Sequence, residues 1–225
     1  MSTNPRVYAS NLSPFSGRLR IAAALKNIEI DFELPPGGSG SAQIKAINPF
    51  GKIPIMFDGD HTLVESFALL EYLEDARPGT RSLRPADAAQ LARVRALVLL
   101  FDYNVLKAMG GVFAQLLSPT PNADLARAAF DDIEAELNKL VHFFDAEGPA
   151  IGGALTIADC AMAPFAFLMD TLAPVFGVVS PTQRVPRFAA WWKHVAAVPE
   201  VAKVTAGMAQ AFAAMAAARK AAAQN

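Results

Sequence analysis

The stretch that decides the fold is PFGKIPIMFDGDHTLVES, residues 49–66. A proline follows Ile53, so the Ile53–Pro54 peptide bond can be cis at modest cost. A cis bond would turn the N–H and C=O of Ile53 outward, where the backbone of an extended ligand can pair with them. Ser66 opens a helix, and the free N–H groups at a helix start bind anions. The stretch therefore predicts a slot for a small peptide, with backbone pairing at one end and a carboxylate site at the other.

Charge and hydropathy restrict the partners of the chain. A net charge of −1 over 225 residues gives no electrostatic reason for binding nucleic acid or an anionic membrane surface. No uninterrupted apolar run reaches the roughly 18 residues that a bilayer span needs. The N-terminus lacks the apolar stretch of a signal peptide. We therefore expect a protein without nucleic-acid or membrane partners.

Cysteine and histidine usage predicts the cellular compartment and the absence of a metal site. Cys160 is the only cysteine, which excludes an intrachain disulfide and favours a reducing compartment, and hence a cytoplasmic location. Cys160 itself is expected to be a small buried side chain. The three histidines, His61, His142 and His194, lack the spacing of metal ligands. We expect no metal site.

The first 76 residues alternate between strand and helix patterns. We predict strands at 6–10, 28–34, 53–57 and 61–64. We predict helices at 14–27 and 66–76, and a short helix that ends at residue 46. The order is βαβ-αββα. The first two strands should be parallel with a right-handed crossover, and the last two should form an antiparallel hairpin.

Beyond a polar, proline-containing linker at 78–87 the strand signal vanishes. Helical patterns follow at 87–117, 122–147, 156–172, 186–198 and 199–222. The last carries an apolar stripe of Val204, Met208, Phe212 and Met215. The fold class is therefore α/β plus all-α, with an α/β domain at 1–77 and an all-helical domain at 88–225.

This layout resembles the cytosolic glutathione transferase superfamily over essentially the whole chain. Four segments carry the resemblance: Asn48–Pro54 through Glu65-Ser66, Ser13–Ala22, Thr156–Asp159, and Pro186–Trp191 followed by 198–201. The second resembles the first helix of serine-dependent classes such as tau, zeta and phi. The resemblance implies a thioredoxin-like first domain that binds glutathione, and a helical domain that contributes the site for the second substrate.

Ser13 is the candidate catalytic residue. Ser-Pro is a common helix start, so Ser13 can be an N-cap with Pro14 in the first turn. The resemblance implies a second role, in which its hydroxyl donates a hydrogen bond to the thiolate of glutathione. A thiol with a pKa near ~8.5 is mostly protonated at neutral pH, and a hydroxyl donor at a helix N-terminus favours its ionised form. Tyr8 ranks second, and the other rivals in the same loop are Ser10, Asn11 and Ser16.

Five further residues are candidates for binding glutathione. Ile53, before Pro54, would pair with the cysteinyl backbone, and Lys52 would contact the glycine carboxylate. Ser66 would hold the γ-glutamyl carboxylate and Glu65 its ammonium, which suits an α-amino acid head group. Each also has a plain structural interpretation, as a strand entry, an exposed lysine or a helix cap.

One departure from the family pattern concerns the glycine end of glutathione. Many members have a lysine or histidine about nine residues before the Asn-Pro, where this chain has Ser39-Gly40-Ser41. Lys45 is the nearest cation and belongs to the next predicted helix. We expect binding at the glycine end to be weaker or differently arranged.

The second substrate is expected against an apolar wall. Candidate wall residues are Phe15, Tyr103, Asn104, Lys107 and Phe113, with Met208 and Phe212 above them. These side chains favour a small hydrophobic electrophile.

The sequence is thus predicted to encode a glutathione transferase of the detoxification type, with glutathione as co-substrate. The resemblance also implies a homodimer. One alternative is a glutathione-dependent isomerase or dehalogenase of small organic acids, which would want cations in the second site. Another is a non-catalytic ligand-binding or protein-interaction member of the same fold.

Overall fold

The structure is a computed structural model that describes residues 4–222. The chain forms two compact units. One runs up to Leu83 and resumes at Pro199, and the other spans Arg84–Val198.

The first unit is built on a four-stranded sheet with the strand order β2-β1-β3-β4. The strands are β1 (Arg6–Tyr8), β2 (Asp31–Glu33), β3 (Ile55–Asp58) and β4 (His61–Val64). β1 pairs in parallel with β2, and β3 pairs antiparallel with β4, both as predicted. β1 also pairs antiparallel with β3, which joins the two halves of the sheet. The first two strands are shorter than predicted. β2 starts late because Asn27 ends the preceding helix in the left-handed conformation and the chain enters the sheet only at Asp31.

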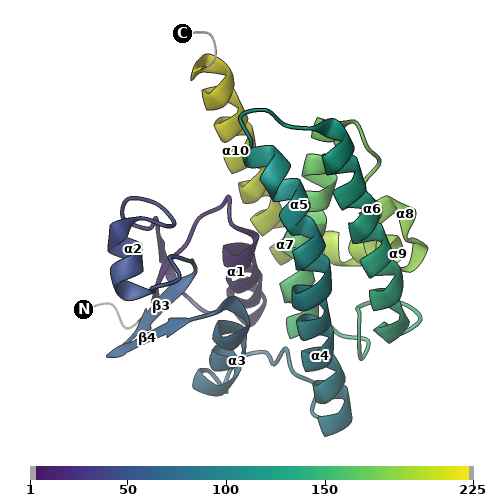
Figure 1. The fold of residues 1–225 in the computed structure, drawn as a ribbon. Coiled ribbons are helices and arrows are strands. Elements are labelled where there is room, and N and C mark those ends of the chain that lie inside the picture. The colour runs from purple at the N-terminus through teal and green to yellow at the C-terminus, as the bar shows by residue number, and fades with distance from the viewer. Residues whose placement is uncertain (1–3, 223–225) are drawn as a thin grey trace. The chain divides into compact units, whose positions relative to one another are not determined.

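Three helices accompany this sheet: α1 (Pro14–Lys26), α2 (Ala42–Ile47) and α3 (Ser66–Ala76) (Figure 1). Side-chain oxygens cap the first two helices. Ser13 accepts the N–H of Ser16, and Ser41 accepts that of Ile44. The β3–β4 hairpin and α3 begin and end close to the predicted residues, because local turn and cap residues fix them.

A buried ion pair joins α1 to α3. Lys26 Nζ lies 2.7 Å from Glu74 Oε1, and the two side chains are only 1% and 5% exposed. The ammonium also donates to the Arg81 carbonyl at 2.8 Å. Glu74 in turn accepts hydrogen bonds from the Ser82 hydroxyl and the Leu83 N–H. The pair thus ties both helices to the chain segment that leaves the first unit.

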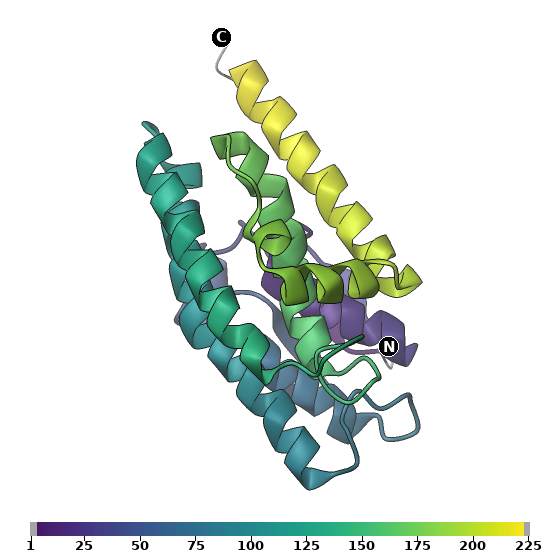
Figure 2. The same ribbon diagram turned by 90° about the vertical axis from the view of Figure 1, so that its right-hand side faces the viewer.

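The last helix, α10 (Pro199–Ala222), belongs to the first unit and not to the helical domain predicted at 88–225. It is one unbroken helix in Figure 2. α10 packs on α1. Sequence order could not show this return, because the packing partner lies near the other end of the chain.

The second unit is all-helical. It contains α4 (Ala88–Leu100), a π-helical turn (Phe101–Val105), α5 (Leu106–Leu117), α6 (Ala123–Leu140), α7 (Ile157–Leu172), α8 (Pro181–Arg184) and α9 (Pro186–Ala196), with short 3₁₀ turns at Val141–Phe143 and Ala173–Phe176. α5 and α6 lie side by side.

Two helix predictions in this unit need correction, and one short helix was not predicted. The predicted helix 87–117 is interrupted by the π turn, where the Asn104 amide donates to the Leu100 carbonyl and competes with the regular backbone ladder. The predicted helix 122–147 ends in the 3₁₀ turn at Phe143, after which Asp145 pairs with Ala150. The four-residue α8 was missed because it is shorter than any periodic pattern.

The predicted capping box at the start of α7 is present. Asp159 is buried and accepts four hydrogen bonds, two from Thr156 and one each from the Ala150 N–H and the Trp191 indole. Burial raises the pKa of Asp159, and the four donors oppose this rise. Cys160 next to it is fully buried, as expected.

By length and composition alone, three helical stretches of the described chain could cross a membrane: Ala88–Leu117, Ile157–Phe176 and Pro199–Ala221. The expectation that no segment is apolar enough to span a bilayer, which considered only uninterrupted apolar runs, is therefore wrong for these three stretches. The second stretch is 67% buried inside the protein, so packing of α7 accounts for its apolar composition.

We predict that the Lys26–Glu74 pair is required for the stability of the first unit. Lys26→Met leaves the Glu74 carboxylate buried without its cation, which should cost about 3–5 kcal/mol of unfolding free energy. The measurement is urea unfolding followed by far-ultraviolet circular dichroism. Lys139→Met is the control, because it breaks an exposed pair with Glu136 and should cost less than about 1 kcal/mol. Equal losses in the two variants would contradict the prediction.

Candidate functional site

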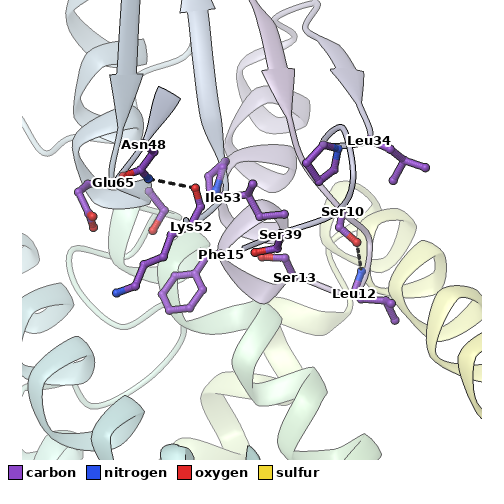
Figure 3. A pocket seen from close by; sticks show the side chains of 14 residues that line it. Ser10, Leu12, Ser13, Phe15, Leu34, Ser39, Asn48, Lys52, Ile53 and Glu65 are labelled. Atoms are coloured by element: carbon purple, nitrogen blue, oxygen red, sulfur yellow. Dashed lines mark hydrogen bonds between the residues drawn. The ribbon is translucent and has the colours of Figure 1, made fainter. Parts of the chain in front are cut away.

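The first unit contains a cavity of about 720 Å³ at the N-terminal ends of α1 and α3. Four segments contribute to its wall, and Figure 3 shows Glu65 and Leu34 at opposite sides of it. It is lined by Ser10, Leu12, Ser13, Phe15, Leu34, Pro35, Gly38, Ser39, Asn48, Lys52, Ile53, Pro54, Glu65 and Ser66. All six residues predicted for thiol activation and glutathione binding are therefore among the residues that line one cavity.

Ser13 lies at the N-cap of α1 and lines the cavity. Its oxygen accepts the N–H of Ser16 at 3.3 Å. A hydroxyl has two lone pairs and one proton, so capping uses a lone pair and leaves the proton available to a ligand. The two roles considered for Ser13 in the sequence are therefore compatible.

The rivals of Ser13 are arranged differently. Ser10 lines the same cavity, where its hydroxyl accepts the Leu12 N–H. Ser16 is fully buried, and its hydroxyl accepts the Ser10 N–H. Asn11 lines a separate hollow beside α10. Tyr8 packs edge-on against Phe57, with ring centres 5.2 Å apart, and does not line the cavity.

Ser66 and Glu65 form the end of the cavity at the start of α3. Ser66 is buried, and its hydroxyl accepts a hydrogen bond of 3.2 Å from the guanidinium of Arg18, which is fully buried. Glu65 has a positive φ of 70°, one of two such non-glycine residues in the described chain. Backbone strain of this kind is concentrated at functional sites. The Ser66 hydroxyl at a helix start, which suits an anion, and the Glu65 carboxylate, which suits a cation, are thus neighbours on a constrained backbone.

The segment before β3 provides free backbone groups. The Ile53–Pro54 peptide bond is cis, as predicted. Neither the N–H nor the C=O of Ile53 has a hydrogen-bond partner within the described chain. Asn48 holds this segment, because its amide donates to the Lys52 carbonyl and its oxygen accepts the Phe50 N–H. An extended peptide could therefore pair with Ile53.

Another part of the cavity wall is a loop of small residues that includes Gly38 and Ser39. Gly51, with φ of 68°, lets this loop come close, since a Cβ there would stand 3.2 Å from the Cα of Gly40. The Gly51 carbonyl accepts both the Gly40 N–H and the Ser39 hydroxyl. Lys52 is exposed at the cavity wall.

Phe15 is the only member of the predicted electrophile wall that lines the cavity. Its ring stands over the Arg18 guanidinium at 5.2 Å. Tyr103, Asn104 and Lys107 are exposed residues of the second unit, and Phe113 is half-buried there. Met208 and Phe212 lie on α10, the first buried and the second half-buried. The roles of these residues stay predictions.

Sequence reasoning missed two residues that shape the site, Arg18 and Asn48. Arg18 shares a helix face with Ala22 and Leu25, four and seven residues on, so an arginine on the apolar face was a usable signal. Asn48 begins the segment that carries the resemblance, but its side chain was assigned no role from the sequence. Within residues 4–222 no group of three or more His, Cys, Asp or Glu side chains is placed to hold a metal ion.

Comparison with known proteins places this cavity in a family. Residues 7–81 match the model of the glutathione S-transferase N-terminal domain, and residues 88–194 match that of the C-terminal domain. A probable glutathione S-transferase, GSTU1, of Oryza sativa subsp. indica is 32% identical over 201 residues, 85% of each chain. A probable maleylacetoacetate isomerase of Caenorhabditis elegans is 28% identical over 167 residues, 72% of this chain and 78% of the relative.

A solved structure shares the fold and carries the ligand. Rice GST1 in complex with glutathione superimposes with a TM-score of 0.74 at 27% identity, over 89% of this chain and 91% of that one. Together, the two domain matches, the rice relative and the shared fold show that the chain belongs to the glutathione S-transferase family.

Proposed function

We propose that this protein is a glutathione transferase that binds glutathione in the cavity of the first unit. The observation that carries the proposal is the convergence of three features on one cavity. These are the N-cap hydroxyl of Ser13, the unpaired backbone of Ile53, and Ser66 beside Glu65. They match, in order, a thiol, a peptide backbone and an α-amino acid head group.

In the proposed mechanism Ser13 stabilises the reactive form of glutathione. Its O–H donates to the thiolate sulfur, and the N-terminal end of α1 adds favourable electrostatics. The sulfur lone pair then attacks an electrophilic carbon and forms a C–S bond. The displaced pair of electrons departs with a leaving group or goes to a neighbouring atom that is later protonated. The protein supplies position and charge, and glutathione supplies the nucleophile.

The proposed electrophile is hydrophobic, because Leu12, Phe15, Leu34 and Pro35 give the cavity an apolar wall next to Ser13. The isomerase alternative has the nematode relative in its favour. It would need cations for an acidic substrate, and Lys52 is the only cation among the lining residues. We therefore prefer the transferase. By family resemblance we also propose a cytoplasmic homodimer with a role in detoxification.

The first prediction is that the protein is retained on immobilised glutathione and turns over a chromogenic aryl halide in the presence of free glutathione. Retention should be abolished by competition with free glutathione. A protein that is neither retained nor active would overturn the proposed function. Retention without turnover of aryl halides or of a maleyl acid would favour the non-catalytic alternative.

The second prediction separates the two roles of Ser13. Ser13→Ala should lower kcat/KM about 10- to 100-fold, because one hydrogen bond to a charged group is lost. The pKa of the bound thiol should rise by about one to two pH units, seen as loss of thiolate absorbance at neutral pH. Loss of the helix cap should cost about 1 kcal/mol of stability.

Matched variants distinguish donation from capping. Ser13→Thr keeps both the proton and the acceptor and should retain thiolate formation, whereas Ser13→Asp caps the helix without a proton to donate and should not. Ser10→Ala and Tyr8→Phe are controls expected to keep the thiol pKa. Unchanged thiolate absorbance in Ser13→Ala would mean that Ser13 only caps α1.

The third prediction concerns the positive φ of Glu65. Glu65→Gly relieves backbone strain but removes the proposed acceptor of the γ-glutamyl ammonium. Stability should change by less than about 1 kcal/mol, while glutathione affinity falls about tenfold. Asn27→Gly is the control, because Asn27 also has a positive φ but lies outside the cavity. Equal affinities of the two variants would contradict a binding role for Glu65.

A further inference from the structure

We propose that the hollow beside α10 is a separate ligand site, which binds a small monocarboxylate with an apolar, preferably aromatic, body. The hollow lies in the first unit and is lined mainly by residues of α1, of the segment that leads into β2, and of α10. None of its lining residues lines the cavity at the N-terminal ends of α1 and α3. Binding in the hollow therefore does not require the proposed transferase activity.

The hollow exists because small side chains stand where α1 and α10 pack on each other. α1 contributes Ala23 and Ala24 to the lining, and α10 contributes Gly207. A Cβ on Gly207 would stand 3.7 Å from the Asn11 amide, an ordinary contact distance, so a side chain could enter here without a clash. The volume of the hollow is about 540 Å³, which is within the usual range of small-molecule sites.

Arg20 is the charged group that a ligand would meet. Its Cζ atom lies 4.0 Å from the centre of the Phe32 ring, and its guanidinium forms no hydrogen bond and no ion pair within the described chain. The Nε atom is buried without a hydrogen-bond partner. Burial lowers the pKa of Arg20. A half-buried cation without an anion is costly, and a carboxylate fits a guanidinium well because it accepts two parallel hydrogen bonds.

The other charges around the hollow favour a ligand with a single negative charge. Lys203 on α10 is an exposed second cation, which forms no ion pair within the described chain. Glu29 and Asp31 are exposed carboxylates in the same lining, and Glu29 accepts a hydrogen bond from the Asn4 amide. These two carboxylates repel further negative charge, so a monocarboxylate suits the hollow better than a phosphate dianion.

The apolar part of the lining accounts for the body of the ligand. The apolar side chains that are half-buried there are Ile28, Ile30, Phe32 and Val204. They lose further contact with water when a flat apolar group covers them, which favours binding in proportion to the area covered. The apolar body thus adds to the affinity that Arg20 provides for the carboxylate.

The test is titration calorimetry of the full-length protein with four probes. The probes are 1-naphthoate, its neutral amide 1-naphthamide, 1-naphthyl phosphate, and acetate. We expect 1-naphthoate to bind, and 1-naphthamide to bind at least about tenfold more weakly, because it lacks the charge that pairs with Arg20. Acetate should also be at least about tenfold weaker, because it lacks the apolar body. 1-Naphthyl phosphate should bind less tightly than 1-naphthoate.

Variants with matched controls locate the ligand. Arg20→Met should weaken 1-naphthoate at least about tenfold and remove its advantage over the amide, whereas Arg127→Met, at an exposed position on α6, should change neither. Gly207→Leu keeps Arg20 but fills the hollow, and it should abolish binding. Gly110→Leu adds the same side chain to open space on α5 and should leave binding unchanged.

Four results would overturn the inference. They are failure of 1-naphthoate to bind, equal binding of 1-naphthoate and 1-naphthamide, tighter binding of 1-naphthyl phosphate, and full binding in Gly207→Leu. Phe15→Ala alters the wall of the other cavity and should leave binding of 1-naphthoate unchanged. Loss of binding in Phe15→Ala but not in Gly207→Leu would place the ligand next to Ser13 instead. Glutathione binding is measured separately, so these results leave the proposed function as it stands.

Discussion

The parallel, in-register packing of α1 on α3 is the constraint on which the cavity depends. Two buried contacts join the helices, Arg18 to Ser66 and Lys26 to Glu74, and both span 48 residues of sequence. Because the offset is equal at both contacts, the helices run side by side in the same direction. The two contacts are about 12 Å apart along the helix axes. Both helices therefore begin at the same end of the unit, and their positive N-termini face one cavity.

Buried cations explain why this packing is specific. An isolated charge in the interior is expensive, so Lys26 requires Glu74, and any sliding of one helix along the other would separate them. The buried guanidinium of Arg18 places a positive charge against the Ser66 hydroxyl. The contact that aligns the helices thus also favours an anion where α3 begins. The contact that stabilises the first unit and the proposed anion site therefore share Ser66.

The sequence predicted the features that local chemistry determines. The β3–β4 hairpin follows from Asp58-Gly59, and the caps of α1 and α7 follow from Ser13 and Thr156, because each depends on neighbours a few residues away. It could not predict the Arg18–Ser66 contact or the return of α10 to α1, since both join residues far apart in the chain. The π turn was also hidden, because its register shift leaves the apolar periodicity of the long helix intact.

Within the cavity, the residues found from sequence are those whose backbone is constrained, and this has a physical reason. A cis proline, a helix start and a positive φ leave local signatures, and they also hold groups still enough to recognise a ligand without further loss of entropy. The loop around Ser39 is also held, because the Gly51 carbonyl accepts the Gly40 N–H and the Ser39 hydroxyl, but its glycines and serines offer a ligand no charged side chain. The side chains that can pair with charges on a ligand therefore lie outside this loop, at Lys52 and Glu65.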